Sequence, residues 1–265
     1  MVVLVATLNN KNVPELVKNM NLSEVDTIVV NQSTSGRSET HLEKVEHSTI
    51  IYSDRLGLSA SRNDAIAQAE DSAICQIADD DLVFVDQYES IVEKAYQEFP
   101  DADIIILGMD FRNHPFPKKN LPKGKVGFLK SMRVVSYQIN FKKSSIKQVD
   151  INFDERFGIG SKYGSGEENI FLFDALKKGL KVYSYPEVIA TLLDRPSHWD
   201  RKATYSFYKN RGAIFKRMTP NWYWLLIIQF GIRKHDSLFP KISLGESIRY
   251  MFQGAREFEN SGYSK

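Results

Sequence analysis

The sequence has little cysteine, no long apolar run and none of the common phosphate-binding glycine motifs. Cys75 is the single cysteine among 265 residues, so an internal disulfide is excluded and a reducing, cytoplasmic setting is expected. It stands in the apolar stretch 73–77, which favours a small buried side chain over a catalytic thiol. No stretch reaches the roughly 20 apolar residues of a membrane-spanning helix. The apolar start, 1–7, also lacks the basic beginning of a signal peptide.

Several catalytic and nucleotide-binding motifs are missing as well. The chain contains no G-x-G-x-x-G fingerprint and no G-x-x-x-x-G-K-[ST] loop, which weighs against dinucleotide-binding and P-loop proteins. A G-x-S-x-G elbow is absent, and the five histidines show no zinc-like spacing with the cysteine. These absences leave other nucleotide-binding α/β folds open, and nucleic acid is not expected as a partner.

Apolar runs and helical patterns alternate along the first half of the chain. Strands are expected at 2–7, 25–30, 49–52, 73–77 and 103–107, with helices at 13–20, 59–70 and 87–99. This alternation predicts a doubly wound α/β fold with a mainly parallel sheet, which binds ligands beyond the carboxyl ends of its strands. After a loop at 113–125, we expect antiparallel strands within 126–154, a helix at 167–178 and strands at 182–185 and 188–193.

Charge divides the chain unevenly. Residues 201–265 hold 12 Lys or Arg and 4 Asp or Glu, a net charge of +8, whereas residues 1–200 carry −6. The pattern after Trp199 is helical throughout, so we predict a domain at 1–200 and a basic, aromatic helical extension at 201–265. Its apolar run from Trp222 suits either an anionic membrane surface or packing between two subunits of a homodimer.

Asp79, Asp80 and Asp81 follow the fourth expected strand. Three adjacent carboxylates repel one another, and a divalent cation offsets that cost. Mg²⁺ or Mn²⁺ accepts such oxygen ligands and shares them with substrate phosphates. A solvated acidic turn is the plain alternative, but the position at a strand end favours a site.

Two helix starts complete the set of candidate sites. The segment 56–63 combines a glycine turn, a serine that could cap the helix, and Arg62, and so resembles an anion site. In the segment 165–169, Ser165 and Glu168 have the spacing of a capping box. Either Glu167 or Glu168 could instead act as a general base toward an acceptor hydroxyl, and the two interpretations are compatible.

In this order and spacing, the motifs resemble the family-2 glycosyltransferases of the bacterial polysaccharide type. The match rests on Thr7-Leu8-Asn9, Asn31-Gln32-Ser33, residues 57–63, Asp79-Asp80-Asp81, residues 153–158 and Gly166-Glu167-Glu168, and it spans about residues 1–200. The resemblance implies a GT-A fold, a Rossmann-like, mainly parallel sheet flanked by helices, here with the helical C-terminal extension. It also implies an inverting transfer of a sugar from a nucleotide-diphosphate sugar, expected to be a UDP-sugar, to a saccharide acceptor.

The resemblance further assigns roles to individual residues. The nucleotide-sugar site would consist of Thr7, Asn9, Asn31, Arg62, Asp79 and Asp80. Mn²⁺ or Mg²⁺ would be bound by Asp81, with Asp79 and His198 as further candidate ligands. Glu168 would be the general base, supported by Glu167. A lipid-linked saccharide is an expected acceptor, which would place the enzyme in the cytoplasm, peripherally on the inner face of the membrane.

The sequence departs from the family pattern at three places, one of which is the usual downstream histidine, which is not clearly present although His198 is a candidate. Asn31 stands where the second strand usually ends in an aspartate, so the hydrogen-bonding pattern offered to a base differs. The acidic pair is Glu-Glu rather than Glu-Asp. A nucleotidyltransferase is a second hypothesis, disfavoured because residues 9–12 replace its glycine- and lysine-rich loop, and a non-catalytic nucleotide-sugar-binding module is a third.

Overall fold

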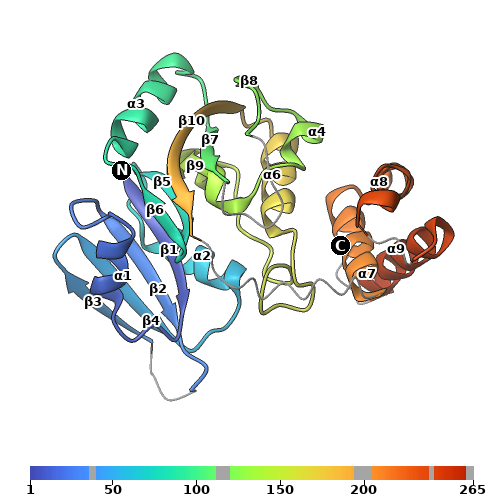
Figure 1. The fold of residues 1–265 in the computed structure, drawn as a ribbon, viewed down its shortest axis with the longest axis horizontal. Helices are drawn as coiled ribbons and strands as arrows, with labels where there is room; N and C mark the ends of the chain where they lie inside the picture. Colours follow the sequence, from blue (N-terminus) through green and yellow to red (C-terminus); the bar gives the residue numbers. More distant parts are fainter. Residues whose placement is uncertain (36–39, 112–119, 194–204, 239–241, 261–265) are drawn as a thin grey trace.

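The computed structural model describes residues 1–35, 40–111, 120–193, 205–238 and 242–260. Its centre is a ten-stranded sheet in the order β3-β4-β2-β1-β5-β9-β7-β10-β6, with β8 paired to β10 (Figure 1). The strands are β1 Val2–Leu8, β2 Thr27–Gln32, β3 His41–Val45, β4 Ser48–Ser53, β5 Ile74–Asp79, β6 Leu82–Phe84, β7 Ile104–Asp110, β8 Gly124–Lys125, β9 Ile139–Lys142 and β10 Val182–Leu192. Strands β4, β2, β1 and β5 pair in parallel, and β9 is antiparallel to both β5 and β7.

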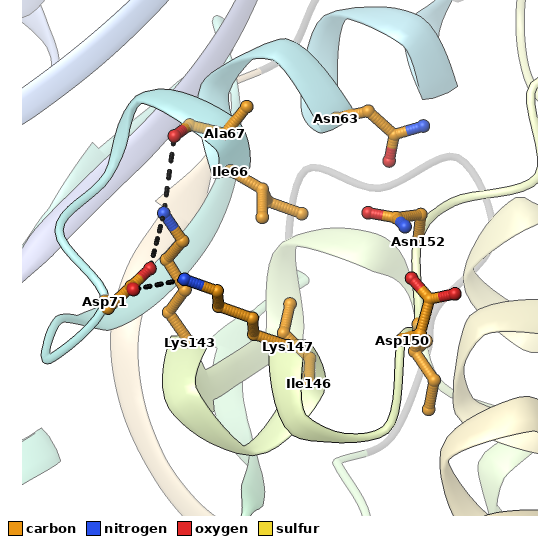
Figure 2. Close-up of a pocket in the computed structure, with 10 residues that line it drawn as sticks. Asn63, Ile66, Ala67, Asp71, Lys143, Ile146, Lys147, Asp150 and Asn152 are labelled. Atoms are coloured by element: carbon orange, nitrogen blue, oxygen red, sulfur yellow. Dashed lines mark hydrogen bonds and ion pairs between the residues drawn. The ribbon is translucent and has the colours of Figure 1, made fainter.

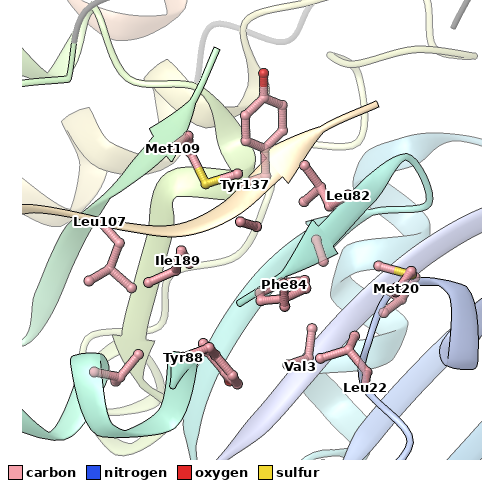
Figure 3. Packing of buried hydrophobic residues seen from close by; sticks show 14 of the residues in the cluster. Val3, Met20, Leu22, Leu82, Phe84, Tyr88, Leu107, Met109, Tyr137 and Ile189 are labelled. Atoms are coloured by element: carbon pink, nitrogen blue, oxygen red, sulfur yellow. The ribbon is translucent and has the colours of Figure 1, made fainter. Parts of the chain in front are cut away.

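Both faces of the sheet are covered because the strands are apolar on both sides. In β1, Val3 and Val5 face one hydrophobic cluster, whereas Val2 and Leu4 face another. The first cluster packs under α1 (Val13–Asn19) and α3 (Tyr88–Glu98), as the side chains in Figure 3 illustrate. The second packs under α2 (Leu58–Gln68), α5 (Lys143–Gln148) and α6 (Glu167–Lys177). This layered arrangement is the GT-A-type fold expected from the sequence.

The C-terminal helices α7 (Tyr205–Met218), α8 (Tyr223–Leu238) and α9 (Leu244–Phe258) form a group beside α6 (Figure 1). A third hydrophobic cluster joins them to Phe157, Tyr163, Ile170 and Phe173. Helices α7 and α9 approach closely at Gly212, where an added Cβ would lie 1.8 Å from the Met251 carbonyl oxygen. The helical extension therefore shares a core with the segment that carries α6.

Some expected elements have different limits in the structure. The two strands expected at 182–185 and 188–193 are one strand, β10, whose pairing with β7 shifts register between Tyr185 and Val188. Gly108 of β7 makes room for this irregularity, since a Cβ there would lie 2.2 Å from the Pro186 carbonyl oxygen. The edge strand β3, the short β6 and the helix α4 (Phe128–Ser131) were not expected.

Candidate functional site

The carboxyl ends of β1, β2 and β5 meet at one edge of the sheet. Thr7 lies opposite Asn31 in the β1–β2 register, and Ala6 lies opposite Asp79 in the β1–β5 register. The Thr7 hydroxyl donates a hydrogen bond to the Asp80 carboxylate at 2.6 Å. Four of the predicted nucleotide-sugar residues are thus gathered where a doubly wound sheet binds its ligands.

Asn31 shapes the loop that follows β1. Its amide nitrogen donates to the Asn10 carbonyl oxygen at 2.8 Å, and its amide oxygen accepts from the Asn10 backbone nitrogen at 3.0 Å. Asn9, which has a positive φ of 54°, accepts a hydrogen bond from the Thr34 backbone nitrogen. Asn31 is 5% exposed, so its buried side chain fixes the conformation of the loop after β1 through the backbone of Asn10.

Arg62 of α2 is the buried centre of the site. It is 2% exposed and donates to Glu167 Oε1 at 2.8 Å, to Asp79 Oδ1 at 2.9 Å and to the Ser136 hydroxyl at 2.8 Å. Burial acts to lower its pKa, but the two carboxylates outweigh burial and raise it. Arg62 therefore holds the end of β5 and the start of α6 together, rather than standing open to solvent.

The helix α2 begins differently from the sequence expectation. Its N-cap is Gly57, with φ 119°, and no serine side chain caps it. Ser59 instead donates its hydroxyl to the Phe157 carbonyl oxygen at 2.6 Å. Gly158 lies beside this contact, where an added Cβ would be 3.0 Å from Ser59 Oγ and 3.4 Å from Glu167 Oε2. The backbone at Gly158 therefore packs closely against the Glu167 carboxylate.

The capping box expected for Ser165 and Glu168 does not form. The N-cap of α6 is Gly166 in the left-handed region, with φ 93° and no side-chain cap. A Cβ at Gly166 would lie 2.5 Å from Ile214 Cδ1 of α7, so both its conformation and its neighbour favour glycine. Because Glu168 does not cap the helix, its carboxylate is not committed to that structural task.

Glu168 is partly exposed and has a strongly shifted pKa. Burial against the surrounding protein and the neighbouring Glu167 carboxylate raise its pKa to about 8, although Arg62 and Arg211 oppose the shift. Glu167 is 6% exposed and bound to Arg62, so the two glutamates have different environments. A carboxylate with a raised pKa is suited to accept a proton near neutral pH.

Two residues of this region were not singled out from the sequence. The side chain of Tyr137 packs against the first hydrophobic cluster, and its hydroxyl points away from that cluster (Figure 3). Burial raises the pKa of the Tyr137 hydroxyl, and the nearby carboxylates of Asp79, Asp81 and Glu168 raise it further. Arg211 of α7 interacts electrostatically with Glu168. Neither belongs to a short motif, so they are found through tertiary packing alone.

The remaining predicted residues are placed as follows. Asp81 is partly exposed in the turn between β5 and β6, and its carbonyl oxygen accepts from the Leu193 backbone nitrogen at 2.8 Å. His198 lies outside the described residues. Cys75 is fully buried, and burial raises the pKa of its thiol to about 12, as expected for a structural cysteine.

The donor set suits a divalent cation shared with a substrate better than a protein-only metal cage. Within the described ranges, no group of three His, Cys, Asp or Glu side chains is arranged to hold a metal. Asp79 is bound to Arg62 and Asp80 to Thr7. Mg²⁺ is commonly held by one or two carboxylates plus substrate phosphates and water. Asp81 fits the place of such a carboxylate ligand.

An ion-pair network fastens α7 to the domain. Arg217 donates to Asp154 Oδ2 at 2.7 Å and to both oxygens of Asp174 at 3.1 and 2.8 Å. Arg156 also binds Asp154, whose side chain is 8% exposed. Burial acts to raise the Asp154 pKa, but the two arginines outweigh it and lower that pKa. The network links the segment after Phe153 with α6 and α7.

A hollow of about 320 Å³ lies elsewhere, between α2 and α5 (Figure 2). Lys143 and Lys147 in its wall both bind Asp71, and the Lys143 amine also donates to the Ala67 carbonyl oxygen at 3.3 Å. Its described lining consists of Asn63, Ile66, Ala67, Asp71, Lys143, Ile146, Lys147, Asp150, Ile151 and Asn152, and includes none of the predicted site residues. The candidate site is therefore at the strand ends rather than in this hollow.

The fold and the gathered residues define a GT-A glycosyltransferase, and a family comparison agrees. The model of Glycosyl transferase family 2 matches residues 2–160, and the chain belongs to this family. No curated protein sequence matches the chain.

Solved structures with a similar fold include S. aureus TarS. The structure of TarS 1–349 in complex with UDP-GlcNAc is 14% identical, with a TM-score of 0.66 over 99% of this chain and 89% of that one. Full TarS is 13% identical with a TM-score of 0.63, over 99% of this chain and 54% of that one. A mannosyltransferase from Pyrobaculum calidifontis, in complex with GDP-Man and Mn²⁺, is 10% identical, with a TM-score of 0.49 over 98% of this chain and 79% of that one.

Proposed function

We propose that this glycosyltransferase is an inverting, metal-assisted enzyme of bacterial surface polysaccharide synthesis. It would move a sugar from a nucleotide-diphosphate sugar, expected to be a UDP-sugar, to a saccharide hydroxyl. The observation that carries the proposal is the environment of Glu168, a partly exposed carboxylate with a raised pKa beside the Arg62–Asp79–Glu167 cluster. Inversion needs a single base, and Glu167 is already committed to Arg62.

In the proposed reaction, the donor lies at the ends of β1, β2 and β5 near Thr7, Asn9 and the acidic run. Asp81 would hold a Mn²⁺ or Mg²⁺ ion, which when bound would supply charge stabilisation for the leaving diphosphate. Arg62 acts by positioning Asp79 and Glu167, since its guanidinium is buried between them. We propose residues 1–200 as the nucleotide-sugar-binding and catalytic domain and residues 201–265 as its helical extension.

Glu168 would perform the proton transfer. As the acceptor oxygen attacks the anomeric carbon, its proton passes to a Glu168 carboxylate oxygen. The new carbon–oxygen bond forms while the bond from the anomeric carbon to the diphosphate oxygen breaks, and the nucleoside diphosphate leaves with that electron pair. Attack on the face opposite the leaving group inverts the anomeric centre.

The test is the variant Glu168→Gln, measured with a panel of UDP-, GDP- and TDP-sugars. We expect turnover to fall by about 10²- to 10⁴-fold, because a general base contributes that much, while donor affinity stays within about twofold. Glu70→Gln, at an exposed carboxylate, is the matched control and should retain activity. Unchanged turnover in Glu168→Gln would exclude Glu168 as the base.

The same donor panel separates the alternatives. A non-catalytic binding module would bind a nucleotide sugar in the presence of metal without transferring or hydrolysing it. A nucleotidyltransferase would join a nucleoside triphosphate to a sugar phosphate and release diphosphate. Either result would replace the proposal.

An anionic membrane surface is the partner we propose for α8. Its exposed apolar side chains are Trp222, Trp224, Leu225, Ile228 and Ile232, the first just before the helix, and Arg233 and Arg249 are exposed on α8 and α9. Aromatic and aliphatic side chains with nearby cations suit a lipid interface, where a lipid-linked acceptor would be found. Within the described residues, no helix is both long and apolar enough to cross a membrane.

Flotation with anionic vesicles tests this contact. We expect binding to vesicles containing phosphatidylglycerol at low salt, and its loss in a Trp224→Glu/Ile228→Glu double variant. Absence of binding by the unaltered chain would overturn the membrane proposal, and sedimentation as a dimer would support the alternative of a subunit contact.

A further inference from the structure

Arg211 is a cation at the candidate site whose carboxylate partner is missing among the described residues. It lies on α7, with its guanidinium carbon 5.5 Å from the centre of the Phe207 ring and 5.3 Å from that of Phe230. Its Nε is buried and makes no hydrogen bond. The side chain as a whole is partly exposed, so a ligand can reach it.

Other buried or partly buried cations in the described part of the chain have carboxylate partners. Arg62 binds Asp79 and Glu167, Arg217 binds Asp154 and Asp174, and Lys216 binds Glu259 at 3.0 Å. Arg211 has the nearby charge of Glu168 but no ion pair or hydrogen bond to it. A desolvated guanidinium is costly without a partner, and the two aromatic faces compensate for part of that cost.

The backbone holds Arg211 in place. Gly212 follows it in sequence and packs on the Met251 carbonyl oxygen of α9, and Gly254 packs reciprocally on the Lys209 carbonyl oxygen, 1.9 Å from where its Cβ would be. Ile214, three residues after Arg211, packs on Gly166 at the start of α6. These contacts hold α7 against α9 and against the start of α6, where Glu168 lies, so the position of Arg211 does not depend on an ion pair of its own.

The in-line geometry of the proposed reaction indicates which anion Arg211 would meet. In an inverting transfer, the acceptor and the leaving diphosphate lie on opposite faces of the anomeric carbon, and the general base is on the acceptor side. Arg211 is associated with Glu168, the proposed base, whereas the metal candidate Asp81 is at the end of β5. A group bound to Arg211 thus belongs to the acceptor side.

We propose that Arg211 binds a phosphate or carboxylate group of the acceptor, so that the enzyme prefers anionic saccharide acceptors. This inference rests on the proposed function, because it takes Glu168 to be the base that receives the acceptor proton. Arginine suits such a group, since its planar donors match phosphate and carboxylate oxygens.

The test separates the acceptor side from the donor side. The protein is saturated with Mg²⁺ and the nucleoside diphosphate that it binds best, and is then titrated by calorimetry with methyl phosphate and, separately, with acetate. We expect Arg211→Gln to weaken binding of at least one of these anions tenfold or more. Arg211→Lys, which keeps the charge, should restore part of the loss, and Arg256→Gln, at an exposed arginine of α9, should change nothing.

Nucleoside diphosphate affinity decides between the two possible sources of the anion. We expect it to change by less than about twofold in Arg211→Gln, and a tenfold loss would assign Arg211 to the donor diphosphate and overturn the inference. The inference would also be overturned if Arg211→Gln bound methyl phosphate and acetate each as tightly as the unaltered protein does. If Arg211→Gln does not fold, as judged by its melting temperature, the comparison of Arg211→Lys with the unaltered protein carries the test. The anion that binds with the higher affinity, methyl phosphate or acetate, then identifies the group.

If no nucleoside diphosphate binds the unaltered protein, the proposed function fails, and the assignment of Arg211 to an acceptor fails with it. The anion titrations without nucleotide then still report on Arg211. Matched acceptors extend the test to turnover. Methyl glucoside is compared with its 6-phosphate and with methyl glucuronide, and Arg211→Gln should raise KM for the two anionic acceptors more than for methyl glucoside.

Discussion

The sheet edge and the C-terminal helices make different contributions to the candidate site. At the sheet edge, polar side chains follow consecutive strands, and Arg62 and Asp79 form an ion pair. The helices bring Arg211 to Glu168 from far along the chain and leave its charge unpaired among the described residues. The family match, residues 2–160, ends before either Glu168 or α7. The segment that the family model matches thus carries the proposed donor site, whereas Glu168 and Arg211, on the proposed acceptor side, lie beyond that segment.

The largest effect is expected from breaking the sheet-edge part of the site. Asp81→Ala should lower kcat/KM by about 10³-fold, because a metal ion contributes several kcal/mol of charge stabilisation. The loss should be accompanied by weaker metal-dependent binding of the nucleoside diphosphate, measured by calorimetry. Asp54→Ala, at an exposed carboxylate near α2, is the control and should keep both properties.

If Asp81→Ala still bound the nucleoside diphosphate in a metal-dependent manner, Asp81 would be excluded as the metal ligand. Asp81→Ala also tests whether the sheet edge and the C-terminal helices act separately. Anion binding at Arg211 should be the same in Asp81→Ala as in the unaltered protein. The two regions act on different parts of the substrate pair, so damage to one should leave binding at the other intact.

The next largest effect concerns the packing that carries Arg211. Gly212→Ala should destabilise the protein by about 3 kcal/mol, at the upper end for overpacking, because the added methyl would meet the Met251 backbone at 1.8 Å. Gly245→Ala, on α9 with open space around it, should be neutral or stabilising by up to about 1 kcal/mol. Chemical denaturation measures both.

Hydrogen exchange in Gly212→Ala then tests how the two regions are joined. Loss of protection in α7 and α9 with retained protection in β1 and β5 would show that the helices open separately from the sheet. Uniform loss would show that the third hydrophobic cluster makes the regions one cooperative unit. A Gly212→Ala protein as stable as Gly245→Ala would contradict the close approach itself.

The pH dependence of catalysis tests the raised pKa of Glu168. A base must be deprotonated to act, so kcat/KM should rise about tenfold per pH unit up to a pKa near 8 and then level off. The apparent value belongs to the coupled Glu167–Glu168 pair. A profile that is flat between pH 6 and 8 would contradict the assignment. Arg211→Gln should move the rise to higher pH, because Arg211 opposes the shift of Glu168.

Much of the fold could be predicted because its strands are continuous apolar runs. The parallel strands β1, β2, β4 and β5 follow directly from such runs. The sequence predicts two strands, at 182–185 and 188–193, where the structure has the single strand β10, because Gly108 on β7 accommodates the irregularity at Pro186. The strand β3 was missed because it is an exposed edge strand with little apolar pattern.

The candidate site could be predicted where it consists of residues at strand ends and helix starts. The residues Asp79 and Glu167 were expected near one another, but their bridge through a buried Arg62 was not. The spacing of Ser165 and Glu168 predicted a cap that Gly166 replaces, because Ile214 of α7 packs against the helix start. Contacts of this kind depend on a helix more than 40 residues downstream, which no local pattern specifies.

The smallest effect concerns the ion pairs that fasten the helices to the sheet domain. Asp154→Asn should destabilise the protein by about 1–2 kcal/mol, less than the 3–5 kcal/mol for a fully buried pair, because Arg217 is partly exposed.

The folded-state pKa of Asp154 is below its ordinary value of 3.8, so the stabilisation by Asp154 is complete above that value and is lost as pH falls through the folded pKa. The difference in melting temperature between Asp154→Asn and the unaltered protein should therefore be largest near pH 7 and narrow below about pH 4. Asp71→Asn removes an exposed carboxylate that pairs with the exposed Lys147 and the buried Lys143, and it should have a smaller effect than Asp154→Asn, since solvent screens the Asp71 charge. An equal effect of both variants would mean that the Asp154 network does no more than a surface ion pair, and that the third hydrophobic cluster alone fastens the helices.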